Sequence, residues 1–454
     1  MNVRPTIVLG IAWLVVILYA FPGQMPPDTF DHLDEARRGL YTDGHPPVND
    51  LIFDVVDHVA PIPLALLVAA TGGFLLGLYL IARRTLSPQR AAWVAAGLFV
   101  FPPVMTPMAA VWKDSVMAAL LALGIAGMLS DRRAYRLAGL AAMFGAAAVR
   151  YNAFAATFPL VVLLFEWERG MHWLARTGIA LVAWVAITLG AFALDSALVD
   201  QKMYYWHSSL AVHDIAGTLA NVDGELPDRE LERLFAGTDL VVHQHIHRRI
   251  REAYTPKNYV PLVFGDTMLW KLPLVGHEPA PAAQRDAIAR AWWEVLRTYP
   301  NAYAIHRATV MGNVLALTRR PAEAVLSREF RYPQLPMFAG TGTRWSRTQL
   351  AMTSVLDALW KTTPLFSPWL YLAVALLLAP FALRHRDALA LLASGVLLES
   401  TLTVLAPTAD YRYSHWMVVA TCVAAVLVVA RRYAAWFRPA ATSQHSDAPQ
   451  ASTQ

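Results

Sequence analysis

Ionisable side chains are concentrated in a short segment near the start of the chain, between two apolar runs. Residues 28–47 read DTFDHLDEARRGLYTDGHPP and include Asp28, Asp31, Asp34, Glu35, Asp43 and His45. A carboxylate or imidazole that faces a reactant can take a proton from a hydroxyl group. We therefore expect these acids to face a site at a membrane surface. The alternative interpretation is a solvated linker that contains a short amphipathic helix.

A second set of charged residues lies in the short turns that separate later apolar runs. Lys113 and Asp114 occur in WKDS, Arg150 in VRYNA, and Asp410 and Arg412 in TADYRYSHW. Charges this close to hydrocarbon are costly and are usually paired or functional. Three cations from three turns could converge on an anion such as a lipid phosphate or diphosphate. The alternative is that neighbouring acids form local ion pairs that close these turns, although Arg150 has no acidic neighbour in the sequence.

The composition places these residues in a membrane protein. The chain has 454 residues, of which 56% are hydrophobic and 16% charged, and its mean hydropathy is +0.38. The apolar residues form blocks rather than the spacing of core helices in a soluble domain. The blocks lie at 6–22, 62–82, 91–111, 114–130, 134–149, 152–166, 173–195, 364–383, 388–407 and 415–430. Several are shorter than the roughly 20 residues of a perpendicular span.

Arginines in the loops orient these runs. They follow the second, fourth, sixth, eighth and tenth runs, at Arg83, Arg84, Arg90, Arg132, Arg133, Arg136, Arg169, Arg176, Arg384, Arg386, Arg431, Arg432 and Arg438. If the runs alternate in direction, all of these arginines lie on one side. The positive-inside rule predicts that this side and both termini are cytoplasmic. The first run lacks a small-x-small cleavage pattern, so we expect a retained anchor.

The predicted fold is an all-α polytopic membrane protein with about ten transmembrane helices and a mostly helical extracytoplasmic cap. Residues 1–195 contain seven runs and the first periplasmic loop, 23–61, which carries the expected catalytic acids. Residues 196–363 form the cap, and residues 364–438 contain the last three runs. The polar residues 439–454 are expected to form a disordered cytoplasmic tail.

Some classes of function are disfavoured by charge and by cysteine and histidine content. The net charge of +5 is spread over many loops without a dense basic stripe. This favours contact with anionic lipid headgroups over nucleic acid. Cys422 is the lone cysteine, which excludes a disulfide within one chain and suggests no zinc site. The histidines of VVHQHIHRR have no adjacent carboxylate and precede two arginines, so we expect no metal there.

Three further ionisable residues each admit two interpretations. Glu399 lies inside the ninth run, where an acid is a functional candidate by default. Its hydroxyl-bearing neighbours equally favour a hydrogen bond that packs helices. His306 and Arg307 follow an aromatic helical pattern, and they either reach a bound phosphate or anchor the cap at the lipid headgroups.

The order of several short motifs along the chain resembles a known family. The motifs are PDTF at 27–30, YTDGHPP at 41–47, WKDS at 112–115, RYNAF at 150–154, HDIAG at 213–217, YAIHR at 303–307 and DYRYSHW at 410–416. In order and placement they resemble the GT-C class of integral-membrane glycosyltransferases, over nearly the whole chain. That class uses polyprenyl-phosphate sugars and an acid in the first extracytoplasmic loop. The resemblance implies a GT-C-like fold, Asp28 as catalytic carboxylate, and Asp43 and His45 as nearby site residues.

The chain departs from this class at one point. Many GT-C enzymes place two acids side by side in the first loop, whereas Thr29 follows Asp28 here. Asp31 lies one helical turn further on and could substitute if the segment is helical. Either Asp28 or Asp31 is therefore expected to be the base. A divalent cation cofactor is left open.

The expected function is transfer of a sugar from a polyprenyl-phosphate donor, entering sideways from the membrane lipid, to a glycan, lipid or protein acceptor. The reaction would occur on the periplasmic face of the bacterial inner membrane. A carboxylate would take the proton of the acceptor hydroxyl, and cations would stabilise charge on the departing phosphate. The expected substrate-binding residues are Asp43, His45, Lys113, Arg150, Asn152, His306, Arg307, Asp410 and Arg412.

Two other functions are compatible with the same residues. A transporter or flippase of a lipid-linked or anionic substrate would use similar cations. It would, however, distribute charges through the depth of the spans and pair its broken helices through an internal repeat. A non-catalytic partner in the assembly of an envelope polysaccharide would have nearly the same sequence as the enzyme.

Overall fold

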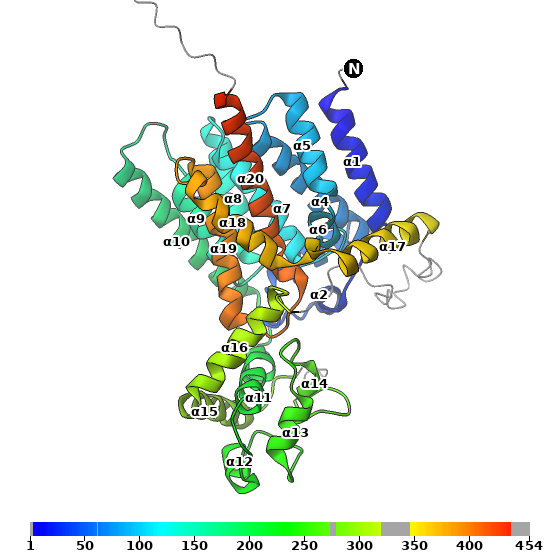
Figure 1. The fold of residues 1–454 in the computed structure, drawn as a ribbon, viewed down its shortest axis with the longest axis vertical. Coiled ribbons are helices and arrows are strands. Elements are labelled where there is room, and N and C mark those ends of the chain that lie inside the picture. The colour runs from blue at the N-terminus through cyan, green and yellow to red at the C-terminus, as the bar shows by residue number, and fades with distance from the viewer. Residues whose placement is uncertain (1–2, 61, 273–277, 319–345, 437–454) are drawn as a thin grey trace, which may run out of the picture.

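The computed structural model describes residues 3–60, 62–272, 278–318 and 346–436. In these ranges the regular elements are all helices, and no extended strand occurs. Most of the long helices form one bundle (Figure 1). They are α1 (Pro5–Ala20), α4 (Ile62–Ala82), α5 (Pro88–Val100), α6 (Pro102–Met108), α7 (Lys113–Met128), α8 (Arg133–Ala148), α9 (Ala153–Leu164), α10 (Trp173–Leu198), α18 (Pro368–Ala382), α19 (Arg386–Leu405) and α20 (His415–Trp436).

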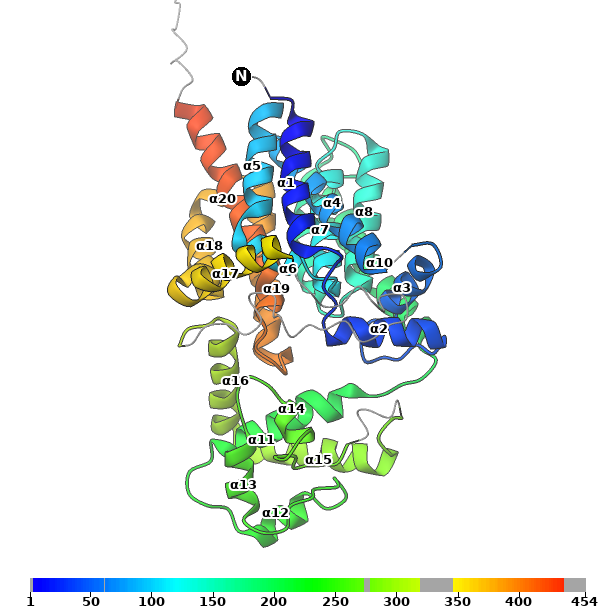
Figure 2. The same ribbon diagram turned by 90° about the vertical axis from the view of Figure 1, so that its right-hand side faces the viewer.

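The remaining helices lie at one end of this bundle or beside it. Two short helices of the first loop, α2 (Pro27–Arg38) and α3 (Val48–Asp57), cover the bundle end, and α17 (Arg347–Thr362) crosses its flank near α1. The cap consists of η1 (His207–Ala211), α11 (Val212–Ala220), α12 (Asp228–Leu234), α13 (Ile246–Ala253), α14 (Val260–Val263), α15 (Ala282–Thr298) and α16 (Pro300–Val314). Figure 2 shows that the cap lies beyond α2, opposite the bundle end where α1 begins and α20 ends.

Within the described residues, four segments are long and apolar enough to cross a membrane, which indicates a multi-pass membrane protein. They are α4, α10, α19 and Tyr411–Tyr433, and the pair formed by α5 and α6 brings the number to five if it counts as one span. Helices α1, α7, α8, α9 and α18 occupy the other predicted runs but are only 12 to 16 residues long. These are shorter than a perpendicular crossing requires.

The third predicted run, 91–111, is broken rather than continuous. Helices α5 and α6 meet at an angle of 69°. Phe101 has an extended backbone with φ −62° and ψ 121°, and Pro102 and Pro103 follow it. A proline disfavours helical geometry in the residue before it and supplies no N–H group to the preceding turn. The bend turns α6 away from the axis of α5, and α6 packs against α20, α4 and α7.

The first loop is helical where the sequence favours it. Helix α2 begins at Pro27, after extended Pro26, and Asp28 lies in its first turn. Proline suits the first helical position, and an acid there complements the positive end of the helix dipole. The helix ends at Gly39, which has the left-handed φ of 60°. This helix also places Asp31 one turn after Asp28.

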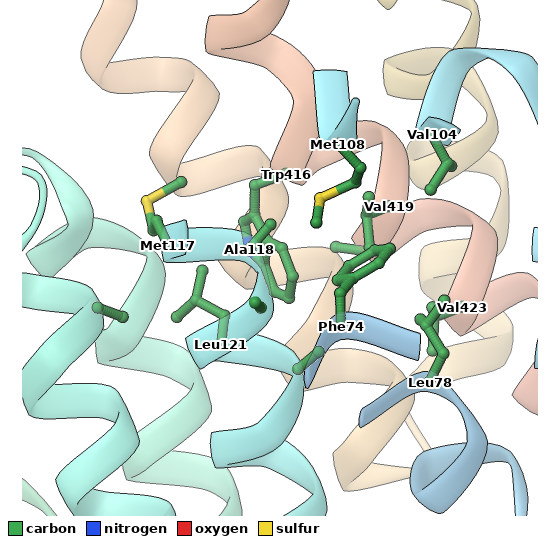
Figure 3. Close-up of a cluster of buried hydrophobic side chains, with 14 of the residues drawn as sticks. Phe74, Leu78, Val104, Met108, Met117, Ala118, Leu121, Trp416, Val419 and Val423 are labelled. Carbon is green, nitrogen blue, oxygen red and sulfur yellow. The ribbon is translucent and has the colours of Figure 1, made fainter. Parts of the chain in front are cut away.

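A buried apolar cluster holds α20 against α4, α6 and α7 (Figure 3). Phe74 and Trp416 are buried and lie within this cluster. The indole Nε1 of Trp416 donates a hydrogen bond of 2.8 Å to Ser394 Oγ on α19, and His415 Nε2 lies 3.1 Å from the carbonyl oxygen of Val104. The start of α20 is therefore fixed, and with it the preceding turn that carries Asp410 and Arg412.

The close packing of α4 on α7 requires Gly77. A Cβ atom added there would lie 2.7 Å from the Cβ of Ala122 and 2.8 Å from the carbonyl carbon of Ala122. Small residues allow such close approach of helices in membranes. We expect Gly77→Ala to lower the unfolding temperature in detergent by several degrees, since overpacking costs about 1–3 kcal/mol.

Gly97→Ala is the matched control for this prediction, because a Cβ at Gly97 would meet no atom within 4 Å. Thermal unfolding should therefore give a lower unfolding temperature for Gly77→Ala than for Gly97→Ala. Equal unfolding temperatures for Gly77→Ala and the wild type would contradict the packing argument.

Candidate functional site

The bundle end that carries α2 faces the cap (Figure 2). A cavity of about 720 Å³ is lined by residues of both. Its wall is formed by α2, the turns before α7, α9 and α20, the end of α19, and cap segments that include Tyr205 and Tyr259. Eight residues expected from the sequence line it: Asp28, Asp31, His45, Lys113, Arg150, Asn152, Asp410 and Arg412. Residues from seven separate stretches of sequence meet around this one space: 26–46, 113, 150–154, 192, 205–209, 258–260 and 402–413.

Asp28 lies at the centre of the charged wall. Its Oδ2 atom is 2.8 Å from Arg412 Nη1 and 3.5 Å from Lys113 Nζ. The side chain of Asp28 is 26% exposed, while those of Lys113 and Arg412 are 12% and 8% exposed. Thr29 Oγ1 donates a hydrogen bond of 2.6 Å to the carbonyl oxygen of Val111. This bond fixes the first turn of α2 beside the start of α7.

The two cations control the protonation of Asp28. Burial acts to raise the pKa of its carboxyl group, but the charges of Arg412 and Lys113 outweigh burial and hold this pKa well below its ordinary value of 3.8. The ion pairs therefore stabilise the fold fully at neutral pH. That contribution is lost only as the pH falls below the ordinary value, toward the pKa of the folded state.

Lys113 has a second partner in His45. The distance from Lys113 Nζ to His45 Nδ1 is 2.8 Å. A lysine ammonium group can only donate, so Nδ1 accepts and the imidazole is neutral. Burial and the charge of Lys113 both lower the pKa of His45 well below its ordinary value. Tyr151 Oη donates to the carbonyl oxygen of His45 at 3.1 Å, which holds this loop against the turn before α9.

Arg150 is paired with an acid that is distant in sequence. It forms a buried ion pair with Asp114, and its Nε donates a hydrogen bond of 2.9 Å to Asn152 Oδ1. Asn152 Nδ2 in turn donates to Thr401 Oγ1 on α19 at 3.1 Å. Lys113 and Asp114 therefore bind different partners, because successive residues of a helix do not face each other.

Arg412 bridges two carboxylates. Its Nη2 lies 3.3 Å from Asp410 Oδ2, while Nη1 holds Asp28. The guanidinium carbon lies 5.1 Å from the ring centroid of Trp112 and 5.2 Å from that of Tyr413. The local ion pair between Asp410 and Arg412, one of the two interpretations of this turn, therefore forms. Arg412 also pairs with Asp28 of the first loop, a contact that the sequence alone could not indicate.

Glu35 also lines the cavity, and it supports the first loop. Its two carboxylate oxygens accept hydrogen bonds from the backbone N–H and the hydroxyl group of Thr42, at 2.8 and 2.9 Å. Asp43 lies outside the cavity lining. Its Oδ1 accepts from the backbone N–H groups of Met203 and Tyr204, at 2.5 and 3.2 Å. Asp43 thus ties the first loop to the segment that leads into the cap.

His306 and Arg307 also lie outside the cavity lining. Both bind Asp214, at 3.1 Å from His306 Nε2 and 2.5 Å from Arg307 Nη2. Arg307 Nη1 also donates to the carbonyl oxygen of Ala406 at 2.9 Å, and Ala406 lines the cavity. The motifs HDIAG and YAIHR therefore meet in one buried cluster that fastens the cap to the end of α19.

A buried pair in the first loop was not anticipated from the sequence. His32 Nδ1 lies 2.5 Å from Asp50 Oδ1. Burial raises the pKa of Asp50 to about 8. Burial, followed by the charge of Lys113, lowers the pKa of His32 to about 3. The contact between His32 and Asp50 joins α2 to α3. The only sequence signal was the position of both residues in the acid-rich loop.

The remaining candidates have structural contacts. His247 is buried, with Nε2 2.8 Å from the carbonyl oxygen of Leu219 and Nδ1 accepting from the N–H of Leu226 at 3.0 Å. Glu399 accepts a hydrogen bond of 2.8 Å from Ser414 Oγ. This bond joins α19 to the turn before α20. In the part of the chain that the structure describes, no three His, Cys, Asp or Glu side chains are arranged to hold a metal ion.

Comparisons with protein-family models, curated proteins and solved structures found no match to this chain. The function is therefore argued from the residues of the cavity. The lining combines anionic and cationic groups of the bundle end with aromatic side chains from both the bundle and the cap. Such a cavity can bind a ligand that carries both a phosphate and hydroxyl groups.

We expect Arg412→Gln to lower the stability of the fold in detergent by about 1–3 kcal/mol, because it leaves buried carboxylates without their shared cation. Adding Asp28→Asn should recover part of this loss, with a coupling of about 0.5–3 kcal/mol. Thermal unfolding of the two single variants and the double variant measures the coupling.

The matched control is Arg248→Gln, which removes the same charge from an ion pair whose side chains are 70% and 46% exposed. Such exposed pairs contribute about 0–1 kcal/mol. Additive effects of Arg412→Gln and Asp28→Asn would show that this contact does not stabilise the fold.

Proposed function

We propose that this protein is an integral-membrane glycosyltransferase of the GT-C type. It transfers a sugar from a polyprenyl-phosphate donor to a glycan, lipid or protein acceptor on the periplasmic face of a bacterial inner membrane. The observation that carries the proposal is the contact of Asp28 with both Arg412 and Lys113, in a cavity between the helix bundle and the cap.

The proposal includes a topology of ten spans with both termini in the cytoplasm. The arginine-rich loops support this orientation. The described chain also begins and ends at the bundle end that lies away from the cap. Helices shorter than the bilayer, such as α9 with 12 residues, would lie within a locally thinned membrane or beside the protein's own longer helices.

The resting charges of the cavity suit a ligand phosphate. Lys113, Arg150 and Arg412 all line the cavity, and each is paired with a carboxylate. A donor phosphate brings negative charge that can join Asp28 beside Arg412 and Lys113. These cations would then stabilise the negative charge that grows on the phosphate as the bond to the sugar breaks.

The flank of the bundle offers a route for the lipid part of the donor. A groove of about 460 Å³ is lined by Phe154, Phe158 and Trp184 together with Ala155, Leu397, Ser400 and Thr401. Phe154 also lines the charged cavity, and Thr401 is hydrogen-bonded to Asn152 beside Arg150. A hydrocarbon chain in this groove would leave its phosphate close to Arg150.

The cap supplies the other side of the cavity. Tyr205, Ser209, Asn258 and Tyr259 come from the cap region and line the cavity. Aromatic and amide side chains suit the apolar faces and the hydroxyl groups of a sugar. The proposed arrangement therefore has donor lipid at the flank, phosphate at the cations, and acceptor between cap and bundle.

The test uses the purified full-length chain in lipid vesicles supplied with polyprenyl-phosphate hexoses and pentoses carrying a labelled sugar, together with extracted envelope glycans. We expect release of polyprenyl phosphate and transfer of label by the wild type. Asp28→Asn should reduce transfer by about 10²–10⁴-fold, the range typical of a lost acid–base or charge-organising group.

Asp34→Asn is the matched control. Asp34 lies on the same helix, has a side chain that is 57% exposed, and pairs with Arg38 on the surface. The transfer activity of Asp34→Asn should equal that of the wild type. Absence of transfer by the wild type with every donor would refute the proposed function, as would full activity of Asp28→Asn.

A further inference from the structure

Two carboxylates on the cavity wall differ in how strongly cations hold them. Asp28 Oδ2 contacts both Arg412 at 2.8 Å and Lys113 at 3.5 Å. Asp410 Oδ2 contacts Arg412 alone among these cations, at 3.3 Å, through the other guanidinium nitrogen. A carboxylate held by two cations has little affinity for a proton. Asp410 is therefore the better proton acceptor of the two.

The position of Asp410 also favours contact with the acceptor. The backbone N–H of Ala409 donates a hydrogen bond of 2.8 Å to the carbonyl oxygen of Lys257 in the cap, and Thr408 forms an isolated β-bridge with Asn258. Thr408, Asp410 and Asn258 all line the cavity. Asp410 thus lies where the bundle contacts the cap, the side on which the acceptor is proposed to bind. The apolar groove proposed for the donor lipid lies elsewhere, on the flank beside Phe154.

We propose, on the basis of the proposed function, that Asp410 is the base that accepts the proton of the acceptor hydroxyl. Asp28 stays ionised and holds Arg412 and Lys113 in position. In the transfer step, the acceptor oxygen forms a bond to the anomeric carbon of the sugar. The bond from that carbon to the phosphate oxygen breaks, and its electron pair leaves with the polyprenyl phosphate. The hydroxyl proton moves to Asp410 and is later released to solvent.

The charged and titratable surroundings of Asp410 are consistent with this role. Arg412 from the same turn and Asp28 from α2 face it. Thr408 Oγ1 lies 3.4 Å from Asp410 Oδ2 and donates to Tyr413 Oη at 3.0 Å. From the cap side, Lys257 contacts this turn through its main chain. Burial raises the pKa of Asp410, Arg412 opposes this shift, and the charge of Asp28 adds to it.

Opposite pKa shifts in neighbouring acids indicate a division of roles. Asp28, with a lowered pKa, remains a fixed anion. Asp410, with a raised pKa, takes and releases protons closer to working pH. Activity should therefore rise with pH as Asp410 loses its proton, and this rise should depend on Asp410 rather than on Asp28.

The experiment compares Asp410→Asn, Asp410→Glu and Asp28→Asn in the vesicle assay, with turnover measured from pH 4 to pH 9 and donor affinity measured separately. We expect Asp410→Asn to change the affinity for the polyprenyl-phosphate sugar less than Asp28→Asn does, because Asp410 holds Arg412 alone whereas Asp28 holds both Arg412 and Lys113. The turnover of Asp410→Asn should fall by about 10²–10⁴-fold, and the rise of turnover with pH should disappear. Asp410→Glu should regain part of the turnover and show the rise at a shifted pH.

Asp28→Asn should keep the rise with pH while its donor affinity changes, because it alters the cations that hold the phosphate. Thermal unfolding of each variant identifies losses caused by misfolding. The role of Asp410 as the base would be overturned if turnover still rose with pH in Asp410→Asn but no longer did so in Asp28→Asn. That result would leave the proposed function intact. An inactive wild type would overturn the proposed function, and the role of Asp410 with it.

Discussion

The ion pair between Asp28 and Arg412 is the contact on which the rest of the site depends. It joins the first turn of α2 to the turn before α20, near opposite ends of the chain. It can form only if α20 packs correctly on α4 and α7, and if Thr29 holds α2 against Val111. A buried pair with one partner missing is strongly destabilising. The pair therefore selects one arrangement of the bundle end.

The charges around this pair balance one another within the cavity. Lys113 is shared between Asp28 and His45, and Arg150 is held by Asp114. A buried charge without a partner would be costly, so the resting protein supplies its own anions where a ligand phosphate is proposed to bind. A ligand phosphate would share Arg412 and Lys113 with Asp28, so these cations are paired both before and after the ligand binds.

The cap takes part in the site through several connections rather than one. Asp43 and Thr42 connect the first loop to residues 201–204 at the start of the cap. Asp214 of the cap forms an ion pair with Arg307, which donates a hydrogen bond to Ala406 at the end of α19. These contacts place Tyr205 and Tyr259 over the cavity. Residues that were expected to touch the substrate directly, His306 among them, instead hold the cap in position.

The sequence by itself determined the helical character of the described chain, the places where apolar helices begin and end, and the location of many site residues in the turns between these helices. Each follows from local physics, namely the apolar blocks, the prolines and the polar turns that separate the blocks. The helix boundaries agree closely with the apolar runs, apart from the break at Phe101. That break was readable from Pro102 and Pro103, but hydropathy alone concealed it.

Only the tertiary structure decided which charges meet. Lys113 and Asp114 are neighbours in sequence yet bind Asp28 and Arg150, because adjacent side chains on a helix point in different directions. The pairing of residue 28 with residue 412 depends on how the helices pack, and no local pattern encodes a contact over that separation. The cations beside each carboxylate, which give Asp28 and Asp410 different proton affinities, are likewise brought there only by the assembled cavity.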